Sequence, residues 1–193
     1  MQRKGLIVMS ELDDYRKILK DLAAVDSGAF INNSSIDHAA TMIEELFRNA
    51  KGLVKIVSGL LNPDVYDRPG LLTSVREFLE KSRDNKISII LQQGGQITSL
   101  SLASNNFIVF LNKYRDQVDL YKVPEYVAET ITNHFMVLKT LNDNYAWRFE
   151  IDTKAHIANG SFNNGSNGEK LSQKFDDLVT RSEPILFDGL VLA

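Results

Sequence analysis

The chain has 193 residues, of which 44 % are hydrophobic and 24 % charged, and its formal net charge at pH 7 is −3. These values are typical of one globular domain that is long enough to bury its own core. The absence of cysteine excludes disulfides, thiolate metal sites and a cysteine nucleophile. Non-specific nucleic-acid binders usually carry a basic excess, so the net charge gives no support to a nucleic-acid ligand.

The sequence contains no apolar run near the roughly 20 residues that a membrane-spanning helix requires. Arg3 and Lys4 precede an apolar run at 6–8, as in the start of a signal peptide, but this run is too short and Glu11 follows at once. We therefore expect a cytoplasmic protein with no membrane partner.

The first two thirds of the sequence alternate amphipathic and apolar segments. Ser10, with Asp13 as its capping-box partner, opens the first helical stretch, and residues 33–35 supply caps for the second. In chain order, the apolar periodicity predicts a helix at 10–25, a strand at 29–31, a helix at 36–50, a strand at 53–57, a helix at 69–79, a strand at 87–91, a helix at 99–114 and a strand at 118–123. Strands that alternate with helices predict a parallel sheet with crossover helices.

The pattern changes in the last third of the chain. Residues 134–140 and 145–151 are predicted as two strands of a β-hairpin, because the segment 141–144 between them carries turn residues. A further strand is predicted at 156–162.

A last helix follows, with Ser166 and Glu169 as its capping box. We therefore expect an α/β domain with a mixed, mostly parallel sheet, helices on both faces and an antiparallel hairpin near the C-terminal end. The single domain is expected to span 1–181, with residues 1–28 as an N-terminal helix appendage and 182–193 as a C-terminal tail.

Three histidines are the candidate metal ligands or proton carriers. His38 lies on a predicted helix with no second ligand at the helical spacing that metal sites use. It is interpreted as a surface or cap-proximal residue, and His156, at the start of a strand, is interpreted in the same way. The sequence predicts no metal site and no cofactor.

Gly94-Gly95 follows a predicted strand and precedes a helix, where α/β sheets place their ligand loops. The surrounding residues form neither a G-x-G-x-x-G nor a G-K-[ST] motif. A plain turn is the favoured interpretation, and a nucleotide-sensing domain that binds at this loop stays open as an alternative.

A further pattern begins at His134, which is followed by acidic turn residues, a strand and then Gly160-Ser161-Phe162-Asn163. With these residues the chain resembles the phospholipase-D-like superfamily, which carries H-x-K on a late strand, an Asp after it and G-S-x-N beyond. The segment Ile56-Val57-Ser58-Gly59 and the run from Tyr126 to His134 are also similar to that family. The resemblance covers residues 29–180 and implies one half of a phospholipase-D-like fold, with small single-motif members forming homodimers.

The resemblance implies that His134 acts as nucleophile or acid, forming a phosphohistidine, and that Ser161 and Asn163 contact phosphate. One departure from the family pattern is large. Met136 occupies the position of the lysine that would stabilise charge on the phosphoryl oxygens. The Asp of the family pattern falls on Leu141.

The hairpin register decides what surrounds His134. If the turn is centred on residues 142–143, Leu138 pairs with Trp147, and His134 lies on an apolar face with Met136, Trp147 and Phe149. A slip by one residue would instead bring Arg148 to the side of His134, where its charge could replace that of the missing lysine.

The leading hypothesis is a degenerate phospholipase-D-like domain that serves as a binding or assembly module with a protein partner. Some members of the superfamily occur in restriction and phage-defence systems, so a bacterial defence context is a hypothesis too. The alternative is an active homodimeric phosphodiesterase or nuclease on a nucleic acid or other phosphodiester. It would use His134 from both protomers, with Ser161, Asn163 and Arg148 as phosphate contacts.

Overall fold

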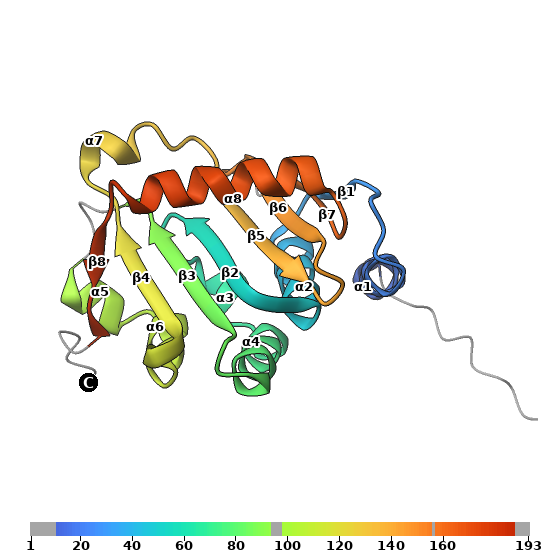
Figure 1. Ribbon diagram of the computed structural model, residues 1–193, viewed down its shortest axis with the longest axis horizontal. Helices are drawn as coiled ribbons and strands as arrows, with labels where there is room; N and C mark the ends of the chain where they lie inside the picture. The colour runs from blue at the N-terminus through green and yellow to red at the C-terminus, as the bar shows by residue number, and fades with distance from the viewer. Residues whose placement is uncertain (1–10, 94–97, 156, 188–193) are drawn as a thin grey trace, which may run out of the picture.

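One mixed β-sheet forms the centre of the molecule, and helices cover both of its faces (Figure 1). The computed structural model describes residues 11–93, 98–155 and 157–187. Within them the strands are β1 (Ile31–Asn33), β2 (Ala50–Ser58), β3 (Lys86–Leu91), β4 (Val118–Lys122), β5 (Phe135–Thr140), β6 (Tyr145–Asp152), β7 (Ile157–Ser161) and β8 (Glu183–Ile185). Their order across the sheet is β1-β7-β6-β5-β2-β3-β4-β8.

Parallel pairing joins β2 to β3 and β3 to β4 in the middle of the sheet. The strands outside this group pair antiparallel with their neighbours. The helices are α1 (Glu11–Ala24), α2 (Ile36–Arg48), α3 (Pro63–Tyr66), α4 (Pro69–Lys81), α5 (Ser99–Ala103), α6 (Asn106–Asn112), α7 (Glu125–Ala128) and α8 (Gly165–Val179). The expected α/β class, with a mixed sheet and helices on both faces, is confirmed.

The two faces of the sheet bury two separate apolar clusters. Helix α8 crosses one face (Figure 1), where Phe175 and Leu178 pack on residues such as Val57 and Trp147. The other face is covered by α2, α4 and α6 and contains the larger core, which includes Met42. Alternation of side chains along each strand sends neighbouring residues into different clusters, so Met136 belongs to the larger core and Val137 to the α8 side.

Sequence signals at several helix ends are matched by capping contacts. Helix α2 begins after Ser35, whose side chain accepts a hydrogen bond from the His38 backbone N–H, and α4 begins at Pro69, which fits the first turn because proline has no N–H to pair. The predicted cap of α8 is wrong. Asn164, and not Ser166, is its N-cap, because the Asn164 side chain accepts from the backbone N–H of Asn167.

Two other expectations differ from the structure. The helix expected at 99–114 is divided into α5 and α6, because the Asn105 side chain caps α6 by accepting from the Ile108 N–H. Part of the segment expected as a tail forms β8 on the edge of the sheet. That strand has three residues and includes Pro184, so it is too short for a periodic pattern to reveal.

The N-terminal helix α1 packs on α2 at one end of the molecule (Figure 1). Leu19 is fully buried in the larger core, and the ring of Tyr15 stacks on His38 with 4.1 Å between centroids. His38 is therefore half-buried near the start of α2, next to the helix cap.

The hairpin of β5 and β6 is present, but the favoured register is wrong by one residue. Met136 pairs with Arg148, and Val137 with Trp147. The loop has three residues because the Thr140 N–H donates to the Asn144 carbonyl, 2.8 Å away, and Asp143 takes a left-handed conformation with φ of 63°. Three-residue hairpin loops commonly place a left-handed residue in this way. The alternative slip is thus the register that forms.

Candidate functional site

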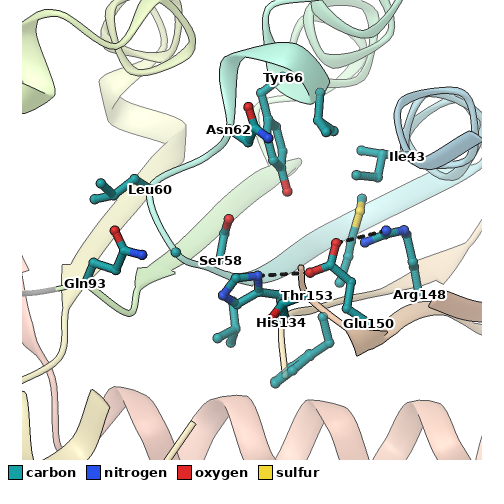
Figure 2. A pocket seen from close by; sticks show the side chains of 15 residues that line it. Ile43, Ser58, Leu60, Asn62, Tyr66, Gln93, His134, Arg148, Glu150 and Thr153 are labelled. Carbon is teal, nitrogen blue, oxygen red and sulfur yellow. Dashed lines mark hydrogen bonds and ion pairs between the residues drawn. The ribbon is translucent and has the colours of Figure 1, made fainter. Parts of the chain in front are cut away.

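A pocket of about 240 Å³ lies at the carboxyl end of the parallel strands (Figure 2). Ser58 ends β2 and Gln93 follows β3. Because β5 runs antiparallel to β2, His134, immediately before β5, lies at the same edge of the sheet. Open α/β sheets place their ligands at this edge.

The pocket has an apolar wall and a polar rim. Apolar side chains come from α2, α3, β2, the β2–α3 loop and β5: Ile43, Val57, Leu60, Val65, Phe135 and Met136. Polar side chains come from β2, α3, β6 and the loops beside them: Ser58, Asn62, Tyr66, Gln93, His134, Arg148, Glu150 and Thr153. Its volume is below the roughly 300–1,000 Å³ of pockets for drug-sized ligands, so any ligand held here is small.

A row of three charged or titratable side chains crosses the pocket (Figure 2). Nδ1 of His134 lies 3.0 Å from one carboxylate oxygen of Glu150. Arg148 donates to the other oxygen, also at 3.0 Å, and its Nε donates to the Asn33 side chain. The Arg148 side chain is only 5 % exposed, so its charge is neutralised by Glu150 inside the protein.

The second ring nitrogen of His134 is also engaged. Its Nε2 lies 2.9 Å from Oε1 of Gln92. The Gln92 amide nitrogen donates to the carbonyls of Ala128 and Ile131, which fixes which end of the amide faces the ring. Both ring nitrogens of His134 therefore lie within hydrogen-bonding distance of side-chain oxygens, those of Glu150 and Gln92.

The electrostatics of the site agree with this network. Burial alone would raise the pKa of the Glu150 carboxyl, but the hydrogen bond from His134 and the charge of Arg148 outweigh burial and lower it below its ordinary value. Burial raises the pKa of the Tyr66 phenol. Tyr66 thus lines the pocket as a neutral hydroxyl.

The geometry limits what this pocket can do chemically. A histidine that attacks phosphorus needs an accessible lone pair on one ring nitrogen, and side-chain oxygens already occupy the space beside both ring nitrogens of His134. Met136, which is 2 % exposed, contributes a thioether where a phosphoryl site would need a cation. Among the described residues, no group of three histidine, aspartate or glutamate side chains converges as metal ligands.

The structure brings together some of the predicted site residues and leaves others apart. His134, Met136 and Arg148 line the same pocket, while Trp147 and Phe149, expected beside His134, lie on the α8 side of the sheet. That expectation is wrong because of the one-residue shift in register.

Ser161 is fully buried on β7 opposite Trp147, and its hydroxyl accepts from the Asn163 N–H. Neither Ser161 nor Asn163 lines the pocket that contains His134, and their assignment as phosphate contacts stays a prediction. Gly94-Gly95 and His156 fall outside the described residues.

Two important residues were not identified from the sequence. Glu150 is two positions beyond Arg148 on one strand, so alternation places both on the same face, and two charged residues within an apolar strand were a usable signal. Gln92 follows the last residue of β3, at the strand end where ligand contacts are expected. Its amide carried no motif that could single it out.

No family model and no curated protein sequence matches this chain. Among solved structures, TrmBL2, an archaeal chromatin protein with a novel mode of DNA binding, superposes with a TM-score of 0.55 and 11 % identity over 90 % of this chain. The chain spans 61 % of the length of TrmBL2. Nuc from Salmonella typhimurium, a phospholipase D family member, superposes with a TM-score of 0.52 and 14 % identity, over 82 % of this chain and 98 % of Nuc.

At these identities the similarity shows the fold alone. The sheet and its helices are like those of a phospholipase D family member. Among the described residues no helix is long and apolar enough to cross a bilayer.

Proposed function

We propose that this protein is a binding domain with a phospholipase-D-like fold, and that its pocket holds a small polar ligand without hydrolysing a phosphodiester. One observation carries the proposal: both ring nitrogens of His134 are engaged by side-chain oxygens, those of Glu150 and Gln92. A base or nucleophile needs one of those nitrogens free.

The rest of the pocket supports the same proposal. Among the described residues that line the pocket, Arg148 is the one arginine or lysine, and Glu150 neutralises its charge. A phosphoryl group here would therefore lack the charge stabilisation that typically contributes about 3 kcal/mol or more.

The chemistry of the rim favours an uncharged ligand rich in hydrogen-bonding groups. Hydroxyls of Ser58 and Thr153 and amides of Asn62 and Gln93 line the pocket. Each of these groups can both donate and accept hydrogen bonds. A small compound with several hydroxyl or amide groups fits both the volume and this lining.

Turnover of bis(4-nitrophenyl) phosphate tests the absence of hydrolysis. We expect the wild-type protein, His134→Ala and the matched control His38→Ala to release nitrophenol at the same background rate. Release by the wild type that is lost only in His134→Ala would overturn the proposal.

Ligand binding is tested by thermal unfolding in the presence of a panel of small polyols, sugars and amides. We expect at least one compound to raise the midpoint for the wild type and not for Asn62→Leu. If no compound stabilises the wild type, the pocket does not bind this class of ligand.

An active homodimeric phosphodiesterase is the second candidate, and one observation favours it. Glu150 holds the imidazole of His134 in a fixed orientation, as the third group does in many nucleophile sites. This candidate also requires a second copy of His134 from a partner protomer. A strictly monomeric protein by light scattering would remove it, whereas a dimer with His134-dependent turnover would favour it over the binding domain.

The remaining functional hypotheses stay predictions. A role as an assembly module with a protein partner, a bacterial defence context and nucleotide binding at Gly94-Gly95 have no further support in the described residues. Thermal unfolding with ATP and GTP tests the nucleotide hypothesis, since binding at Gly94-Gly95 would raise the unfolding midpoint.

A further inference from the structure

A second pocket lies on the α8 side of the sheet, away from His134. Its volume is about 410 Å³, and its wall contains the aromatic residues Phe30, Trp147 and Phe149. The Phe30 side chain is 60 % exposed and packs edge-on against the indole of Trp147, with 5.7 Å between ring centroids. Exposed aromatic rings of this kind are platforms on which planar groups can stack.

One buried polar group in the wall of this aromatic pocket has no partner among the described residues. The indole Nε1–H of Trp147 is buried and makes no hydrogen bond within the described residues. Asn159, Asn167 and Lys170 line the pocket as well. The amide and ammonium groups of these three side chains can form hydrogen bonds with a planar ligand that carries acceptors.

A basic groove continues from the aromatic pocket along α8. It has a volume of about 350 Å³ and lies between α8 and the segment around Thr130 and Ile131. Lys170 lines both the groove and the aromatic pocket, so the two cavities are neighbours. Lys174 and Arg181 also line the groove, together with one carboxylate, that of Asp177.

The three cations form a stripe on one side of the helical segment. Lys170 and Lys174 are four residues apart on α8 and share one helix face, and Arg181, just beyond the end of α8, lines the same groove. At 1.5 Å per residue the stripe is about 16 Å long. Within the described part of the chain, none of the three forms an ion pair with a carboxylate.

We infer that this face binds single-stranded nucleic acid, with one base in the aromatic pocket and the following phosphates on the stripe of Lys170, Lys174 and Arg181. Aromatic stacking beside a positive groove is how proteins hold single strands without reading their sequence. The net charge of −3 does not oppose this, because the stripe concentrates positive charge locally. The site goes beyond the proposed function, since it lies on the opposite face of the sheet from the His134 pocket.

Fluorescence anisotropy with a labelled thymidine oligonucleotide of about 12 nucleotides tests the inference. We expect binding that weakens as salt rises, with a slope that falls by about 0.7 for each phosphate contact removed. The double variant Lys170→Ala/Lys174→Ala should therefore lower the slope by about 1.4. Lys113→Ala removes one lysine charge from an exposed position on α6's side of the molecule and should leave the slope unchanged.

The aromatic contribution is tested separately by Phe30→Ala. This variant should weaken binding about tenfold, because one base loses its stacking partner, and should keep the wild-type salt slope. Phe30 is mostly exposed, so the variant is expected to fold, and circular dichroism checks this.

Several results would overturn the inference. These are no binding at low salt, equal affinity for the single strand and its duplex, or equal loss of binding in Lys113→Ala and the α8 variants. ATP binding as tightly as the oligonucleotide would assign the site to free nucleotides instead of a nucleic-acid strand.

Discussion

The side-chain oxygen of Gln92 lies 2.9 Å from Nε2 of His134. The other ring nitrogen of His134, Nδ1, contacts Glu150. The Gln92 amide is held in place by two backbone carbonyls near α7. The segment before β5 is therefore fastened to the end of β3 through one glutamine. This contact determines whether His134 is a reactive group or a structural one.

Replacing Gln92 with leucine should destabilise the fold. The change removes the hydrogen bonds of Gln92 to the Ile131 carbonyl, the Ala128 carbonyl and one nitrogen of His134, at a cost of about 1–3 kcal/mol. Urea denaturation measures the difference in unfolding free energy. Gln93→Leu is the matched control, because Gln93 is exposed, and its effect should be close to zero. Equal stability of the two variants would contradict the role assigned to Gln92.

Glu150→Gln should destabilise more strongly, because it leaves the buried guanidinium of Arg148 without a counter-charge. Losing one partner of a buried pair typically costs about 3 kcal/mol. Glu183→Gln removes a carboxylate that pairs with Lys122 at the surface and should change stability by less than about 1 kcal/mol. Chemical denaturation measures the unfolding free energy of both variants. A similar loss of unfolding free energy in the two would mean that burial does not strengthen the ion pair of Arg148 and Glu150.

The pH dependence of stability follows from the lowered pKa of Glu150. The folded protein holds this carboxylate ionised to a lower pH than the unfolded chain does. The stabilisation is therefore complete above the ordinary carboxyl pKa of 4.5 and is lost as pH falls below it. Unfolding free energies between pH 6 and pH 3 should fall more steeply for the wild type than for Glu150→Gln. Parallel curves would show that Glu150 is not the titrating group.

The left-handed conformation of Asp143 fixes the hairpin register and so places Arg148 beside His134. Valine is poorly tolerated at φ of 63°, so Asp143→Val should cost about 1–2 kcal/mol. Asp143→Asn loses only the exposed ion pair with Lys51 and should stay within about 1 kcal/mol of the wild type. Thermal unfolding of both variants tests this, and equal midpoints would argue against the three-residue loop.

Much of the fold follows from local patterns in the sequence. The hairpin was predictable because turn residues separate two β-rich segments, and α2 was predictable from its cap at Ser35. The register was not, because it depends on whether Asp143 adopts a left-handed conformation. The same turn residues are compatible with a three-residue loop and with a four-residue loop.

The site was only partly predictable for a related reason. His134 and Met136 were found through a motif resemblance, and Arg148 through the alternative register. Gln92 is 42 positions from His134, and its contact arises only when β3 and β5 are assembled around β2. No local pattern encodes a pairing at that distance.

Mass spectrometry of the intact protein after incubation with a phosphodiester tests the central claim most directly. A reactive His134 would retain the phosphoryl group as a covalent adduct that survives rapid denaturation at alkaline pH. Because both ring nitrogens are engaged, we predict an unmodified chain at every time point. A phosphoryl adduct that maps to His134, and that is absent from His134→Ala, would contradict the account.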